Sequence, residues 1–124
     1  MLRARNMLQA ATAEYEKALA VVPGDPFVAG KLARTYVELG NHDRAVELAK
    51  PLLALDDQDA SPAVTLGVAL AARGDHDAAR GAFEQALRTS PFDPAVRCGL
   101  ADAYDRLQDP RAGRERTACD RLRR

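Results

Sequence analysis

The fold is decided by residues 66–91, whose sequence is LGVALAARGDHDAARGAFEQALRTSP. Leu66 and Leu70 lie four residues apart on one helical stripe, and Phe83 belongs to a second stripe after Gly74-Asp75. Glycine is the usual residue just beyond a helix because it adopts a positive φ without strain. Aspartate is a frequent N-cap, so Asp75 is predicted to cap the second helix. The stretch therefore predicts two antiparallel helices joined by a tight turn.

This pattern repeats along the chain with a period of 34 residues. The turn at Gly40-Asn41 matches the turn at Gly74-Asp75, so Asn41 is also predicted to be an N-cap. Columns at this spacing include Leu32/Leu66/Leu100, Ala33/Gly67/Ala101, Tyr36/Leu70/Tyr104, Ala45/Ala79/Gly113, Tyr15/Ala49/Phe83, Ala18/Leu52/Ala86 and Asp25/Asp59/Asp93. Such a period predicts identical helix pairs stacked side by side.

We expect seven helices with short connections, so that neighbouring helices run antiparallel. They are expected at residues 3–21, 26–39, 42–55, 60–73, 76–89, 94–107 and 110–122. Pro51 lies inside the third helix, where it removes a backbone hydrogen bond and should bend the helix. Asp25-Pro26 and Asp93-Pro94 are typical of an N-cap followed by a proline in the first turn.

These columns resemble the tetratricopeptide repeat: a leucine followed by glycine or alanine, an aromatic residue four positions after the leucine, then glycine with asparagine or aspartate. The first full unit departs from that pattern, with Ala49 in the second aromatic column and Asp57 in the proline column. The tryptophan column holds Ala29, Ala63 and Arg97, which predicts looser packing there. The resemblance implies an all-α, antiparallel helix-pair superhelix of about seven helices, a solenoid.

The whole chain, residues 1–124, is expected to form one such domain. It divides into a half repeat at 1–25, complete repeats at 26–59 and 60–93, and a degenerate repeat with a capping helix at 94–124. The chain would then begin in the second helix of a pair, which leaves one face without a packing partner. The residues on that face are Leu8, Ala11, Tyr15 and Leu19. Preceding residues or self-association would cover it.

The charge balance argues against a protein devoted to nucleic acids, because 18 basic residues are matched by 18 acidic ones. Residues 110–124 are locally basic, with six arginines against Glu115 and Asp120. A solvated capping helix explains this excess, and nucleic-acid binding is the alternative. No apolar run approaches the roughly 20 residues that span a bilayer. High alanine, arginine and aspartate content indicates a GC-rich bacterial genome.

The cysteines Cys98 and Cys119 form no CxxC pair. Two free thiols in a reducing compartment are expected, which together with the lack of a secretory signal predicts a cytoplasmic protein. A disulfide is the alternative, and it requires Cα atoms within about 7 Å.

The sequence offers no catalytic or metal-binding constellation. His42 and His76 lie one period apart, which separates equivalent atoms by on the order of 10 Å and is too far for a shared metal. There is no glycine-rich phosphate loop, HExxH or GxSxG motif. We therefore expect no enzyme activity, no metal and no cofactor.

The resemblance implies that the first helices of the pairs line a concave groove that receives an extended peptide or a helix of a partner protein. The residues that periodicity places on that side are Phe27, Lys31, Arg34, Glu38, Val64, Thr65, Val68, Asp102 and Arg106. The middle of this row is small and apolar, and Lys31 and Arg34 make one edge basic, which suits a partner with an apolar stripe and an acidic group. An ordinary solvated helix surface is the alternative.

Overall fold

The computed structural model describes residues 2–55 and 58–124, and these residues form helices without any strand. The elements are α1 (Leu2–Val21), α2 (Pro26–Leu39), α3 (His42–Ala49), the 3-10 helix η1 (Lys50–Ala54), α4 (Ser61–Ala72), α5 (His76–Thr89), α6 (Pro94–Arg106) and α7 (Ala112–Leu122). The predicted all-α class is confirmed, with seven α-helices in the described part of the chain.

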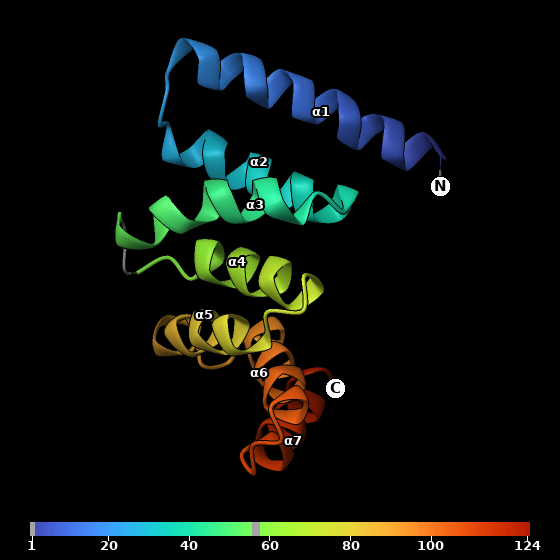
Figure 1. Cartoon of the computed structure of the whole chain (residues 1–124), viewed down its shortest axis with the longest axis vertical. Coiled ribbons are helices and arrows are strands. Elements are labelled where there is room, and N and C mark those ends of the chain that lie inside the picture. Colours follow the sequence, from blue (N-terminus) through green and yellow to red (C-terminus); the bar gives the residue numbers. More distant parts are fainter. Residues whose placement is uncertain (1, 56–57) are drawn as a thin grey trace.

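The helices stack in chain order from α1 at one end to α7 at the other (Figure 1). Each helix packs against the next, and the first helices of the pairs, α2, α4 and α6, also contact one another in succession. These three helices therefore form a row of their own, on which a groove can be built. No helix in the described residues is long and apolar enough to cross a membrane.

Most of the predicted helix ends are present. Gly40 has a φ of 84°, and the following N–H, of Asn41, donates to the Tyr36 carbonyl at 2.8 Å. Asp25 accepts from the Phe27 N–H at 3.0 Å, and Asp93 accepts from the Ala95 N–H at 2.9 Å. Asn41 accepts from the Arg44 N–H at 3.5 Å, as its cap position predicts. These bonds satisfy helix-end donors and acceptors that would otherwise need water.

Asp75 is the N-cap residue of α5, as predicted, but its side chain makes no capping bond. Gly74 adopts the expected positive φ of 88°, and the Ala79 N–H bonds to the Asp75 carbonyl, but the Asp75 side chain accepts no bond from the helix start. Its carboxylate lies 3.3 Å from the Arg73 guanidinium instead. The charged neighbour therefore takes the carboxylate that would have capped α5.

Pro51 has a stronger effect than the predicted bend. The α-helix ends at Ala49, and the chain continues as η1 through Pro51. Proline has no N–H to donate four residues back, so the α-helical ladder stops and the tighter 3-10 turn takes over. The proline-column residue Asp57 lies outside the described residues.

The core is built mainly from alanine, with one large ring in a narrow space. Ala45 and Ala79 are fully buried, and Phe83 is nearly so. A Cβ built on Gly67 would lie 2.8 Å from the Phe83 ring, and one built on Gly99 would lie 2.5 Å from it. Only glycine permits this close approach. The ring thereby fills the space where α4, α5 and α6 meet.

The expectation of two free thiols is wrong. Cys98 on α6 and Cys119 on α7 form a disulfide, with their Cα atoms 4.8 Å apart. The two helices pack as a hairpin that turns near residue 108, so the cysteines lie at matching heights on its two arms. The disulfide removes the thiol-based argument for a cytoplasmic location.

Candidate functional site

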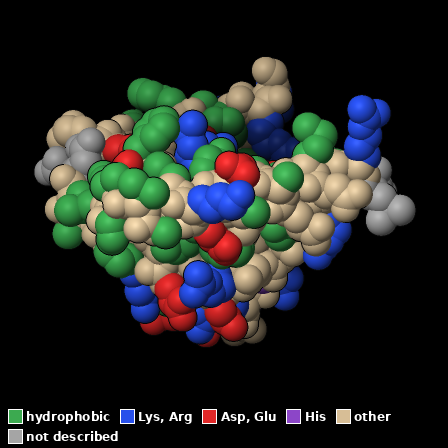
Figure 2. Space-filling view, turned by 90° about the horizontal axis from the view of Figure 1, so that it is seen from above, with side chains coloured by type: hydrophobic (Ala, Val, Ile, Leu, Met, Phe, Trp, Pro, Cys, Tyr) green, Lys and Arg blue, Asp and Glu red, His purple; other side chains and the backbone are tan. Residues whose placement is uncertain are grey.

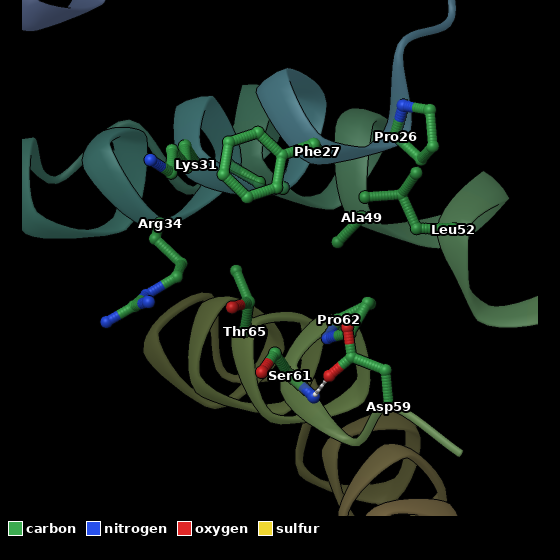
Figure 3. Close-up of a pocket in the computed structure, with 12 residues that line it drawn as sticks. Pro26, Phe27, Lys31, Arg34, Ala49, Leu52, Asp59, Ser61, Pro62 and Thr65 are labelled. Carbon is green, nitrogen blue, oxygen red and sulfur yellow. Dashed lines mark hydrogen bonds between the residues drawn. The ribbon is translucent and has the colours of Figure 1, made fainter. Parts of the chain in front are cut away.

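A cavity of about 190 Å³ opens between the start of α2, η1 and the start of α4. Figure 3 shows the Phe27 ring on α2 beside Lys31, at the edge of the opening, with Thr65 and Pro62 on the facing side. Its inner wall is apolar and consists of Gly30, Ala33, Ala49 and Leu52.

Two further hollows adjoin this cavity along the α2–α4 side. One, of about 160 Å³, lies between Arg34 and Glu38 of α2 and Val64 and Val68 of α4. The other, of about 390 Å³, continues from Arg34 towards the start of α6. All three share Arg34 and Thr65. Seven of the nine predicted groove residues thus lie along one depression, which we call the α2–α4 groove: Phe27, Lys31, Arg34, Glu38, Val64, Thr65 and Val68.

Asp102 and Arg106 do not line any of these hollows. They line a separate one with Ala71 and His76, near the ends of α4 and α6. Asp102 also accepts a hydrogen bond from Arg116 of α7 at 2.8 Å, so its carboxylate is already engaged. Their grouping with the other seven residues is not seen, because the row of first helices turns as it advances from α2 to α6.

Thr65 differs from the solvent-facing residue that helical periodicity indicates. Only 8% of it is exposed, and it forms part of the groove wall. A side chain this deep shapes the groove and offers a partner little surface. Val68, by contrast, is 39% exposed in the neighbouring hollow.

The cavity exists because one junction of the repeat lacks its aromatic ring. Ala49 occupies the column of Phe83, and one period before Gly67 and Gly99 the chain has Ala33 and Thr65. The side chains of Ala33 and Thr65 fill part of the space that the ring uses in the next repeat. The remainder stays open towards the groove.

The mouth of the cavity is electrostatically asymmetric. The Lys31 Nζ lies 4.3 Å from the centroid of the Phe27 ring, a cation–π contact. No carboxylate in the described part of the chain forms a salt bridge with Lys31 or Arg34. Asp59 lines the side towards η1, where it accepts a hydrogen bond from the Ser61 N–H at 3.0 Å. Within residues 2–55 and 58–124, the α2 side therefore carries two positive charges that no carboxylate pairs with.

Sequence reasoning missed a pair of tyrosine–glutamate hydrogen bonds that join successive repeats. The Tyr36 hydroxyl donates to Glu16, and the Tyr104 hydroxyl donates to Glu84 at 2.8 Å. Burial and the Glu84 carboxylate raise the pKa of Tyr104 to about 12, and burial together with Glu16 raises the pKa of Tyr36. A signal was present in the sequence, since each tyrosine follows its glutamate by 20 residues.

The predicted looseness at the tryptophan column is found at Ala63, which lines a hollow of about 380 Å³ between η1, α4 and α5, but not at Arg97. Ala29 and Ala63 are buried, and Arg97 Nη1 donates to both carboxylate oxygens of Glu115, at 3.0 and 3.2 Å. Glu115 is only 3% exposed and belongs to the inner side of α7, whereas its position in the charged terminal segment suggested a solvated residue. Arg97 also donates to the Pro91 carbonyl at 2.9 Å, so the ion pair connects α6, α7 and the preceding loop.

The arginines of the terminal segment are partly neutralised within the chain. Arg111 pairs with Asp109 at 2.8 Å, and hydrogen bonds from Arg111 lower the pKa of Asp109 to about 2. Arg116 bonds to Asp102 and Asp105, each at 2.8 Å. Arginines held by carboxylates are poorly placed to bind phosphates, which favours the capping interpretation over nucleic-acid binding.

The repeats match a known protein family. A tetratricopeptide repeat model matches residues 31–94, just over half of the chain. The chain belongs to the tetratricopeptide repeat family. Repeats of this family generally mediate protein–protein interactions.

Two relatives contain regions similar to this tetratricopeptide repeat chain. Cellulose synthase operon protein C of Pseudomonas fluorescens (strain SBW25) is 35% identical over 124 residues, covering 98% of this chain and 9% of that protein. Small glutamine-rich tetratricopeptide repeat-containing protein 2 of Mycosarcoma maydis is 28% identical over 98 residues, covering 79% of this chain and 28% of that protein. The chain thus spans only a small part of either relative.

Solved tetratricopeptide repeat structures share the fold. A structure of MamA (MSR-1) superposes with a TM-score of 0.83 at 26% identity, over 94% of this chain and 67% of that one. TTC0263, a thermophilic TPR protein in Thermus thermophilus, superposes with a TM-score of 0.79 at 25% identity, over 98% of this chain and 69% of that one. These similarities confirm the predicted helical-repeat solenoid.

The face predicted for self-association is half-buried in this tetratricopeptide repeat chain. Its four residues are Leu8, Ala11, Tyr15 and Leu19. Tyr15 and Leu19 pack against the core, whereas Met7 and Val21 on the same helix are well exposed. Seen from the α1 end of the stack, hydrophobic side chains gather on the left and upper parts of the surface, and charged ones lie at the lower edge, in the centre and on the right (Figure 2).

The two histidines lie at equivalent starts of α3 and α5. The Nδ1 atom of His42 is buried and has no hydrogen-bond partner among the described residues, whereas His76 lines the hollow near Asp102. Residues 2–55 and 58–124 contain no group of three or more histidines, cysteines or carboxylates that could hold a metal ion.

Proposed function

We propose that this tetratricopeptide repeat chain is a non-enzymatic interaction module whose α2–α4 groove binds a peptide or helix of a partner protein. The observation that carries the proposal is the continuity of the groove: three adjoining hollows share Arg34 and Thr65 and run along two first helices. A fold alone does not establish a function, so the proposal depends on this site.

The chemistry of the groove suits a partner that is both apolar and acidic. Val64 and Val68 give the floor an apolar stripe, while neither Lys31 nor Arg34 forms a salt bridge with a carboxylate of the residues that the structure describes. Peptide recognition by helical grooves combines such apolar anchors with charge complementarity, which also raises the association rate.

A charge reversal tests the proposal. The Lys31→Glu/Arg34→Glu variant should lose a defined subset of the proteins that the wild type captures from the lysate of the source organism, as quantified by mass spectrometry. Arg121→Glu/Arg123→Glu is the matched control, because it makes the same charge change on exposed arginines at the far end of the chain. Identical partner lists for wild type and groove variant would refute the groove assignment.

Self-association through α1 is the second candidate function. It is supported by the exposed apolar residues Met7, Val21 and Val22, beside the half-buried face at Leu8, Ala11, Tyr15 and Leu19. Light scattering should then show a mass that rises with concentration in the micromolar range and falls for Leu8→Lys. A strict monomer over that range would eliminate this role.

A further inference from the structure

We infer that the cavity at Ala49 takes an aromatic side chain from the partner, and that Lys31 and Arg34 bind a carboxylate next to that side chain. The inference rests on the proposed function and specifies the chemistry of the bound segment: an aromatic residue with acidic residues next to it on one side. The ring would occupy part of the space that an aromatic residue of the chain itself fills one repeat later.

The comparison with Phe83 shows why this space favours a ring. At the later junction the ring lies between Gly67 and Gly99, close enough that a Cβ on either glycine would overlap with it. At the earlier junction the small Ala49 leaves a cavity of about 190 Å³. An apolar cavity of about 150 Å³ is large enough to hold benzene, so this volume suffices for a phenyl group.

The inner walls of the cavity are apolar, so a ring bound there would leave no polar group of these walls without a hydrogen bond. Gly30, Ala33, Ala49 and Leu52 supply its apolar inner surface, and dispersion contacts to an inserted ring would replace empty space there. The Phe27 ring, 69% exposed, lies at the edge of the mouth and presents an aromatic surface for stacking (Figure 3). An aliphatic side chain would gain the burial but would lack this stacking.

The charges at the mouth determine on which side of the partner's aromatic residue its acidic residues lie. Lys31 and Arg34 lie on the α2 side and have no carboxylate partner in the described residues. Asp59 lies towards η1, where a second carboxylate would be repelled. The fitting segment therefore carries its acidic residues on one side of the aromatic residue only.

Three synthetic pentapeptides test this chemistry by NMR titration of the whole, ¹⁵N-labelled chain. They are acetyl-Gly-Phe-Asp-Glu-Gly-amide, the same peptide with alanine for phenylalanine, and the same peptide with two lysines for the acidic pair. The first should shift the amide resonances of Gly30, Ala33 and Thr65. We expect the alanine peptide to bind at least about tenfold more weakly, the scale of burying one phenyl group. The lysine peptide should also bind more weakly, because its charges repel Lys31 and Arg34.

A pair of glycine substitutions links binding to the cavity. Gly30→Leu extends a side chain from the cavity wall, where a Cβ would meet Leu52 Cδ1 at an unstrained 3.9 Å. Gly81→Leu is the control, because Gly81 is also inside a helix and a Cβ there meets nothing within 4 Å. Gly30→Leu should abolish the shifts caused by the phenylalanine peptide, and Gly81→Leu should leave them unchanged.

The outcomes separate this inference from the proposed function. Equal binding of the phenylalanine and alanine peptides, or unchanged binding to Gly30→Leu, would overturn the aromatic anchor. The proposed function would still be tested separately, by the capture experiment with the charge-reversal variant. Absence of binding by all three peptides at millimolar concentration would overturn the inference as well. A dimer in light scattering that Gly30→Leu dissociates would assign the cavity to a second copy of the chain, and would also overturn it.

Discussion

The junctions at Phe83 and Ala49 occupy the same place in two consecutive repeats, yet one is filled and the other is open. Phe83 is held between two glycines on α4 and α6. Ala49 stands between Ala33 and Thr65, and a cavity of about 190 Å³ remains beside it. The difference shows that the period of a repeat fixes where helices pack, whereas the side chains at each junction decide whether it is closed or available to a partner.

The closed junction should be the more sensitive to truncation. Phe83→Ala removes a nearly fully buried ring, and we expect a loss of about 3–5 kcal/mol in the free energy of unfolding, measured by urea denaturation. Phe27→Ala is the control, since its exposed ring should cost less than about 1 kcal/mol. Comparable losses for the two variants would contradict the contrast between the junctions.

The disulfide stabilises the same half of the molecule as the Phe83 junction. It closes a loop of 21 residues between α6 and α7, so its loss should lower the free energy of unfolding by about 3 kcal/mol. Urea denaturation with and without reductant measures this loss. The Cys98→Ala/Cys119→Ala variant should be indifferent to reductant, and a wild type that is equally indifferent would disprove the stabilising role.

Replacing glycine by alanine should change the free energy of unfolding in opposite directions at the two junctions. Gly99→Ala forces a methyl group against the Phe83 ring and should destabilise the chain by about 1–3 kcal/mol. Gly30→Ala places a methyl group beside the open cavity and should stabilise it by about 0.5–1 kcal/mol through helix propensity. Gly81→Ala, with open space around it, reports propensity alone. Equal signs for Gly99→Ala and Gly30→Ala would refute the contrast.

The smallest expected effect concerns the tyrosine bond next to the closed junction. Tyr104→Phe should cost about 1 kcal/mol at neutral pH, because Glu84 keeps Arg80 as a partner at 2.8 Å. The pKa of Tyr104 is raised from 10.0 to about 12, so its hydroxyl contributes fully below pH 10 and loses this contribution as the pH rises towards 12. Wild-type stability, measured by urea denaturation, should therefore fall more steeply than that of Tyr104→Phe between pH 10 and 12. Parallel pH profiles would argue against this bond.

The 34-residue period was enough to predict the helices, the turn glycines and the aspartate–proline starts, since each depends on local backbone chemistry. The pairing of charged side chains, whether between helices or within one turn, was not predicted. In the Arg97–Glu115 and Asp75–Arg73 pairs, a long, flexible side chain has several possible charged partners within reach. Periodicity does not determine which of these partners it binds.

The candidate site was only partly accessible from the sequence. The Ala49 departure was visible in its column, but whether α2 and α4 move together to fill the space is decided by packing. The burial of Thr65 and the separation of Asp102 from the groove follow from the rotation of successive repeats, for which the sequence provides no direct measure.

Xenon binding tests the contrast between the two junctions most directly, because xenon enters apolar cavities that a packed core excludes. In crystals of the chain pressurised with xenon, we predict one xenon atom beside Ala33, Ala49 and Leu52, and none beside Phe83. Gly30→Leu crystals should show no xenon at the first position. Absence of xenon from the Ala49 cavity of the wild type, or equal occupancy at both junctions, would contradict an open site in one repeat and a closed one in the next.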